Sequence, residues 1–213
     1  MNQKITALKI QKRNPERVNV YLDGEYAFGL AKIVAIWLHI GQELDDAKIA
    51  SLKDEDESEV AYQKALHFLS FRPRSEGEVR QRLAKQEYTE SVIEATINRL
   101  KEQHFLGDQQ FASLWVDNRS TFRPRSQRML AMELRNKGVE EDVIFSALET
   151  AEDDEVLAYQ AGQKYVRRLA GLDWQNFRQR LTGYLGRRGF SYGIAAPVVR
   201  RLWAEFNSEE DEL

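Results

Sequence analysis

Hydrophobic positions recur along the chain with a period of 51 residues. The pentapeptide Phe-Arg-Pro-Arg-Ser occurs at 71–75 and again at 122–126, and the apolar positions that follow agree at the same offset. The third copy has Asp173 to Phe177 in place of the pentapeptide but keeps the apolar frame. Three copies of one frame predict three tandem modules. The matching positions include Val79, Leu130 and Leu181, then Leu83, Leu134 and Leu185, and then Ile97, Leu148 and Val199.

Each module is predicted to contain three helices. The proline of the pentapeptide, Pro73 in the first module, ends the first helix because it lacks an N–H and clashes with the preceding turn. Ser75 is expected to be the N-cap of the second helix, and Glu78 stands at the capping-box position. Ser126 is the matching N-cap, although Met129 cannot complete the box. The third helix shows apolar residues at i, i+4 and i+7 in every module.

The turn between the second and third helices also recurs. Gly138-Val139 and Gly189-Phe190 occupy it in the second and third modules, whereas Glu87 stands at the glycine position of the first. In the third module Pro197 falls inside the last helix, where it should kink the helix or delay its start.

The N-terminal segment has the alternation of strands. Asp23-Gly24 between two alternating runs is a strong signal for a two-residue hairpin, and Asn14-Pro15 marks an earlier turn. A three-stranded meander is therefore predicted. Residues 30–40 are predicted to form an amphipathic helix that covers the sheet and ends before Gly41. The acidic stretch that follows is expected to connect this part to the first module, with a short helix around 47–52.

The expected fold class is thus mainly α, with three tandem three-helix modules behind a small β meander and a helix. The predicted parts are 1–42 for the meander and helix, 43–57 for the acidic connector, 58–106, 107–151 and 152–206 for the three modules, and 207–213 for an acidic tail.

Charge is strongly segregated although the net charge is only −3. Residues 43–59 carry eight acids and two bases, whereas residues 164–201 carry nine bases and one acid. Residues 119–137 carry six bases and one acid. This distribution suggests a basic surface that faces an anionic partner. The alternative is that many of these arginines only solvate the outer faces of helices.

Composition argues against several kinds of site. The chain has no cysteine, and its three histidines stand far apart, so neither a disulfide nor a thiolate or histidine metal site is expected. No phosphate-binding loop or nucleophile motif is present, so we expect a binding protein without a cofactor rather than an enzyme. No apolar run is long enough to cross a membrane, and a cytoplasmic monomer is expected.

The segments from Leu134 to Val139 and from Leu185 to Phe190 superficially resemble a helix-turn-helix. In the second module, the residues that would enter a DNA major groove are Glu140, Glu141 and Asp142. Phosphates would repel these carboxylates, so sequence-specific operator binding is not expected.

Taken together, the motifs resemble the bacterial RecX family of recombination regulators. The resemblance rests on the paired pentapeptides, on Glu133-Leu-Arg-Asn-Lys-Gly-Val139 and on Leu185-Gly-Arg-Arg-Gly-Phe-Ser-Tyr192, with the hairpin Val20 to Phe28 resembling the N-terminal extension of some members. It implies tandem three-helix repeats that bind RecA filaments along the groove. It further implies a negative regulator that limits strand exchange, ATP hydrolysis and stimulated repressor self-cleavage.

Six arginines are the candidate contacts to the RecA filament or to the phosphates of single- or double-stranded DNA: Arg72, Arg74, Arg123, Arg125, Arg187 and Arg188. The alternative for Arg72 and Arg123 is that they bond helix carbonyls or pair with nearby acids. Two other classes of function stay open, a nonspecific nucleic-acid-binding protein and a pure assembly scaffold.

Overall fold

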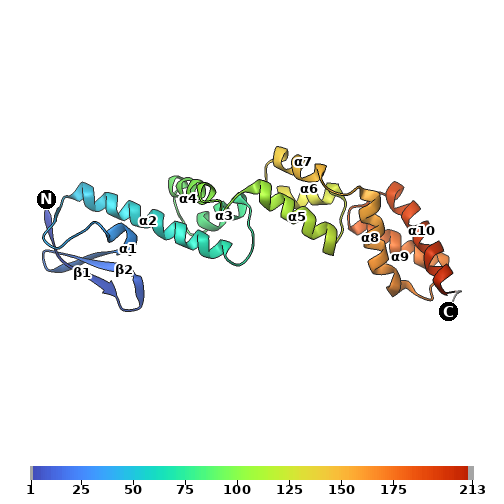
Figure 1. Cartoon of the computed structure of the whole chain (residues 1–213), viewed down its shortest axis with the longest axis horizontal. Helices are drawn as coiled ribbons and strands as arrows, with labels where there is room; N and C mark the ends of the chain where they lie inside the picture. The colour runs from blue at the N-terminus through green and yellow to red at the C-terminus, as the bar shows by residue number, and fades with distance from the viewer. Residues whose placement is uncertain (1, 211–213) are drawn as a thin grey trace. The chain divides into compact units, whose positions relative to one another are not determined.

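The computed structural model describes residues 2–210, and for 207–210 it describes only the backbone. Its elements follow the predicted order, a small antiparallel sheet and then helices, which confirms the mainly helical fold class (Figure 1). Two compact units are present. The first comprises the chain up to Arg74 together with Val79–Leu106, and the second comprises Ser75–Glu78 and the chain from Gly107 onward. Residues 211–213 of the predicted acidic tail lie outside the described residues.

The N-terminal sheet contains the predicted meander and one further short strand. Its spatial order is β3-β2-β1-β4, with antiparallel pairing throughout. Asp23 and Gly24 both have positive φ, 50° and 93°, as a tight hairpin with the right-handed twist of the strands requires. The strands are β1 (Gln3–Gln11), β2 (Asn14–Leu22), β3 (Glu25–Ala31) and β4 (Glu43–Leu44).

The helix predicted over residues 30–40 is wrong in length, whereas its covering role is confirmed in part, because Ala35 is buried in the cluster of the sheet and Val34 and Leu38 pack against it. The structure has only the four-residue α1 (Lys32–Ala35) there. Ile33 and Trp37 of the predicted buried face are exposed, Trp37 by 85%. The following helix shares in covering the sheet and contributes Leu52 to the buried cluster of Ile5, Val20 and Leu30.

That following helix, α2 (Asp46–Leu69), replaces most of the predicted acidic connector. It starts at the N-cap Asp45, whose carboxylate accepts a hydrogen bond from the Lys48 N–H at 2.7 Å. Its first half packs on the sheet, whereas its second half gives Ala61 and Ala65 to the core of the first module. One helix is therefore shared by two cores, and the short helix expected at 47–52 is its beginning.

Two carboxylates of α2 hold neighbouring elements in the first unit. Asp56 accepts hydrogen bonds from the Ala31 N–H at 2.5 Å and from Arg17 at 2.9 Å, so it ties α2 to the edge of the sheet. Glu59, only 7% exposed, pairs with Arg99 at 2.6 Å. A buried carboxylate needs such partners because desolvation without them is costly.

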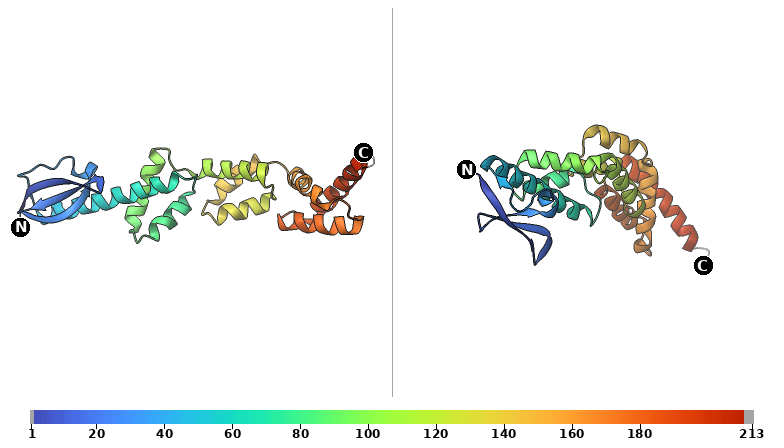
Figure 2. Two further views of the ribbon diagram at one scale, coloured as in Figure 1. Left: turned by 90° about the horizontal axis from the view of Figure 1, so that it is seen from below. Right: turned by 60° about the vertical axis from the view of Figure 1, so that its left-hand side comes forward.

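The remaining helices form the predicted modules. In each module three helices lie side by side around their own buried cluster (Figure 2). The matching residues Val79, Leu130 and Leu181 are all fully buried, as the 51-residue frame predicts. The helices are α3 (Glu76–Ala84) and α4 (Glu90–Glu102) of the first module, α5 (Asp108–Phe122), α6 (Gln127–Arg135) and α7 (Glu141–Glu149) of the second, and α8 (Asp154–Val166), α9 (Trp174–Arg187) and α10 (Tyr192–Glu210) of the third, with a 3-10 turn, η1, at Arg167–Leu169.

The third module departs from the repeat where it lacks the pentapeptide. An offset of 51 from Gln127 would start α9 at Arg178, but α9 starts one helical turn earlier, behind the N-cap Asp173. The Asp173 carboxylate accepts hydrogen bonds from the backbone and the side chain of Asn176, at 2.9 and 2.6 Å, and these bonds lower the pKa of Asp173. Pro197 lies inside α10 and does not delay its start.

Within the described residues, no helix combines the length and the hydropathy that crossing a membrane requires. The same residues contain no group of three histidine, aspartate or glutamate side chains placed to hold a metal ion.

Candidate functional site

Both pentapeptides end in a buried serine that caps the next helix. The Glu78 N–H donates to Ser75 Oγ at 3.1 Å, and the Met129 N–H donates to Ser126 Oγ at 3.2 Å. The Ser75 N–H also donates to the Glu78 carboxylate at 3.3 Å, which completes the predicted capping box in the first copy alone. The two N-cap predictions are therefore confirmed. Each serine side chain accepts a hydrogen bond from a backbone N–H in the first turn of its helix, where N–H groups have no partner within the helix.

The same serines contact the turn of the following module inside the second unit. Ser75 Oγ donates to the Lys137 carbonyl at 2.5 Å, and the Ser126 N–H donates to the Arg188 carbonyl at 3.1 Å. The two carbonyls are 51 residues apart, like the two serines, so equivalent positions meet in both copies, through the hydroxyl of Ser75 and the backbone N–H of Ser126. Neither partner could be found from the pentapeptide alone.

A carboxylate at the start of the following module completes this contact. The Glu76 N–H donates to Asp108 Oδ1 and the Gln127 N–H donates to Asp154 Oδ1, both at 2.7 Å. Asp108 and Asp154 are the first residues of α5 and α8. A negative charge at a helix N-terminus is stabilising because the unpaired N–H groups point at it. We call the serine, this aspartate and the turn carbonyl together the junction contact.

The second arginine of each pentapeptide is engaged within its own module. The Arg74 guanidinium lies over the Phe68 ring, 3.9 Å from its centroid. Arg125 forms an ion pair with Glu133, which also accepts hydrogen bonds from Trp115 at 2.9 Å and Arg119 at 2.8 Å. Such a mostly buried carboxylate depends on its cations, so Arg125 has a structural role.

The first arginine of each pentapeptide faces outward. The side chains of Arg72 and Arg123 are both exposed, and Arg72 Nη1 donates to the carbonyl of the neighbouring Pro73 at 2.9 Å. The carbonyl that Arg72 reaches is therefore in the connecting segment and not at a helix end.

The adjacent arginines Arg187 and Arg188 also have different surroundings. Arg187 is the exposed last residue of α9. Arg188 Nη1 donates to the Pro124 carbonyl at 3.1 Å, and its guanidinium lies 4.5 Å from the centroid of Tyr184, which stacks on Tyr165 at 4.0 Å. Arg188 thus reinforces the junction contact between the second and third modules.

The six candidate arginines therefore divide into two sets. Arg74, Arg125 and Arg188 are partly buried and contact other side chains of the chain, whereas Arg72, which bonds the Pro73 carbonyl, Arg123 and Arg187 are exposed. Further exposed basic residues belong to the third module: Arg167, Arg168, Arg178, Arg180 and Arg200. Residues 164–201 of the third module, with nine bases and one acid, therefore present several of their basic side chains at the surface, as the sequence suggests.

Sequence reasoning missed two pairs of residues. The first pair is Asp108 and Asp154, which lie 46 rather than 51 residues apart and so escape the repeat frame. The second pair is Phe71 and Phe122, the first residue of each pentapeptide, which are exposed by 70% and 69%. Their equal position in the repeat was the available signal.

Family models cover most of the chain. The RecX N-terminal domain matches residues 3–45, and the first, second and third RecX three-helix domains match residues 61–100, 108–148 and 152–199. The matched ranges agree with the sheet and the three modules of the structure.

Curated relatives and solved structures agree with these models. The chain is 34% identical to a protein named Regulatory protein RecX from Bacillus subtilis strain 168, over 97% of this chain and 79% of the relative. It is 33% identical to the protein of the same name from Leuconostoc mesenteroides, over 99% and 80%. A solved regulatory protein RecX superimposes with a TM-score of 0.71 at 29% identity, over 92% of this chain and 98% of the other. RecX from Lactobacillus salivarius, at 22% identity and a TM-score of 0.59, supports the fold alone. This chain belongs to the RecX family of regulatory proteins.

Proposed function

We propose that this protein is a negative regulator of the RecA recombinase, acting in the cytoplasm as a monomer that binds RecA–DNA filaments. In this role it limits ATP hydrolysis, strand exchange and the stimulated self-cleavage of repressors. The observation that carries the proposal is the match to RecX domains along the chain, including all three helical modules. Tandem modules offer repeated surfaces, which suit a partner made of repeated subunits.

The test is a titration of RecA's single-stranded-DNA-dependent ATP hydrolysis with this protein. We expect hydrolysis to fall at ratios well below one protein per RecA monomer, because a bound regulator that blocks filament growth or triggers disassembly affects many subunits. Hydrolysis that is unchanged at equimolar protein would contradict the proposal.

A second candidate function is nonspecific nucleic-acid binding. The exposed arginines of the third module favour it, because cations that neutralise phosphates release counterions on binding. Binding of this kind would weaken steeply with salt and would need no RecA. DNA binding without any effect on RecA would favour this candidate over the first.

Among the candidate arginines, we expect Arg187→Glu to weaken inhibition of RecA while leaving thermal stability unchanged. Arg187 is exposed, so reversing its charge disturbs a partner's surface and little inside the chain. Arg188→Glu is expected to lower stability as well, because Arg188 bonds the Pro124 carbonyl. Inhibition and melting temperature should both be measured for each variant.

Lys85→Glu is a matched control for this pair. Lys85 is exposed and undergoes the same charge change, but it lies outside the candidate set in the first unit. If Lys85→Glu reduces inhibition as much as Arg187→Glu, the effect is one of net charge, and Arg187 is not a specific contact.

A further inference from the structure

Two exposed phenylalanines occupy the same position of the repeat. Phe71 follows the C-terminus of α2, and Phe122 is the last residue of α5. Their exposed fractions, 70% and 69%, are nearly equal. Single exposed apolar side chains are common on protein surfaces and need no explanation. The recurrence of one at equivalent places in two modules is harder to attribute to chance.

The packing of the pentapeptide does not require either ring. Its serine caps a helix and makes the junction contact, and its second arginine, Arg74 or Arg125, is held inside the module. The Phe71 ring does stand edge-on to His67, with centroids 4.9 Å apart, but His67 is itself exposed. Burial of these rings would be favourable by about 25 cal/mol per Å² of apolar surface. That free energy remains available to a partner.

Each phenylalanine is followed by an exposed arginine and has an exposed lysine nearby. Arg72 follows Phe71, and Lys64 and Arg82 line the same groove of about 860 Å³ in the first unit. This groove also contains Glu16 and Glu59, but Glu59 is paired with Arg99.

The second phenylalanine has a similar setting. Arg123 follows Phe122, and the exposed Lys164 donates to the Thr121 carbonyl at 2.5 Å. Aromatic residues, phenylalanine included, and arginine are both enriched at protein interfaces. A partner surface complementary to a phenylalanine followed by an arginine has an apolar pocket with an acidic rim.

We propose that Phe71 and Phe122 are apolar anchors that insert into equivalent acidic-rimmed pockets on two subunits of the RecA filament. This inference rests on the proposed function and deepens it, because it assigns the contact residues. The two copies belong to separate compact units, so each can engage its own pocket. A partner that meets both must present the same pocket more than once, as a polymer of identical subunits does.

Single-stranded DNA is the competing partner, because bases also stack on aromatic rings beside arginines. A nucleic-acid groove places its aromatic residues so that successive bases reach them. Here each ring stands at the same position of the repeat with an arginine directly after it, which favours a protein that repeats one pocket.

The test uses the full-length double variant Phe71→Ala/Phe122→Ala. We expect its affinity for RecA filaments, assembled on single-stranded DNA with a slowly hydrolysed ATP analogue, to fall at least tenfold. Each single variant should lose less, because the remaining anchor still holds the protein on the filament. The melting temperature should stay unchanged, since both rings are exposed.

Phe145→Ala is the matched control. Phe145 is 67% exposed on α7, but the same position of the other modules holds Glu94 and Ala196, so it is not a repeated feature. Its substitution is expected to leave filament affinity unchanged. A loss equal to that of the double variant would show that general surface hydrophobicity, and not the repeated anchor, governs binding.

The outcomes separate this inference from the proposed function. If the unaltered protein binds filaments and the double variant binds equally well, the assignment of Phe71 and Phe122 as anchors is wrong and the proposed function stands. If the double variant loses affinity for single-stranded DNA alone to the same extent, the rings contact DNA instead. If the unaltered protein does not bind filaments, both the proposed function and the inference fail.

Discussion

Gly189→Ala is expected to destabilise the second unit by about 2–5 kcal/mol. Gly189 has a φ of +93°, where a residue with a Cβ loses about 1–2 kcal/mol. A Cβ there would also lie 2.4 Å from Ser126 Oγ and 2.9 Å from Met129 Cβ. Overpacking of this kind costs about 1–3 kcal/mol more, and here it would push apart the junction contact between the second and third modules.

Urea denaturation followed by circular dichroism measures this effect, and Gly171→Ala is its control. Gly171 also has a positive φ, +73°, but among the described residues a Cβ there would meet nothing within 4 Å. The control therefore reports backbone strain alone. Equal losses of unfolding free energy in the two variants would mean that the close approach of Gly189 to Ser126 contributes nothing to stability.

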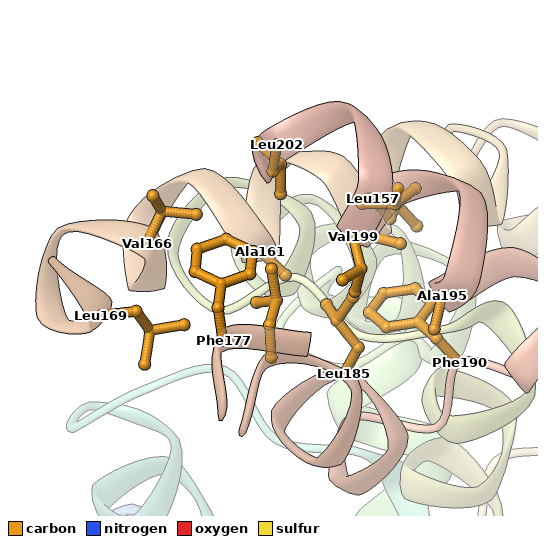
Figure 3. Close-up of a cluster of buried hydrophobic side chains, with 13 residues drawn as sticks. Leu157, Ala161, Val166, Leu169, Phe177, Leu185, Phe190, Ala195, Val199 and Leu202 are labelled. Carbon is orange, nitrogen blue, oxygen red and sulfur yellow. The ribbon is translucent and has the colours of Figure 1, made fainter. Parts of the chain in front are cut away.

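Removing the ring of Phe177 is expected to cost about 3–5 kcal/mol, the range for truncating a buried aromatic residue. Phe177 is fully buried in the third module, where it lies among the side chains of α8, α9 and α10 (Figure 3). Its centroid is 4.9 Å from that of Trp203. Phe177→Ala leaves a cavity that the surrounding helices can only partly fill.

Tryptophan fluorescence during urea denaturation checks this prediction, because Trp174 and Trp203 both pack against this core. In a chain of modules with separate cores, we expect the third module of the variant to unfold before the others. Phe177→Leu, which keeps most of the apolar volume, should cost clearly less. A loss below about 1 kcal/mol for Phe177→Ala, the level of an ordinary surface substitution, would contradict the assigned core.

The module cores were predictable because their signal is local. Apolar residues spaced at the helical period lie on one face of a helix. The 51-residue repeat identifies the same face in each of the three modules. Ser75 and Ser126 were likewise identified from the residues next to them, since a capping serine is recognised by its position before a helix.

The N-terminal helix was predicted too long, because its pattern alone does not say that a second element shares in covering the sheet. Ile33 and Trp37 have helical spacing, but α2 supplies Leu52 to the surface they were expected to cover. The highly acidic first half of α2 resembled a connector in the sequence. Only the fold shows that Asp56 turns inward to Arg17 and the edge of the sheet.

The roles of the arginines depend on residues outside the pentapeptide. Arg74 and Arg125 stand in identical pentapeptides, yet one stacks on Phe68 and the other pairs with Glu133. At the 51-residue offset, Phe68 corresponds to Arg119 and Arg82 corresponds to Glu133. The pentapeptide itself therefore carries no information about which partner its second arginine finds.

Glu87 occupies the turn position that glycine holds in the later modules, with a φ of 65°. A Cβ at Gly138 would lie 3.0 Å from the Cα of Gly77, and at Gly189 even closer to Ser126. A glutamate side chain in that position therefore leaves no room for a serine-capped helix to dock. Tandem duplication upstream of the first module would consequently fail to extend the array unless residue 87 became glycine.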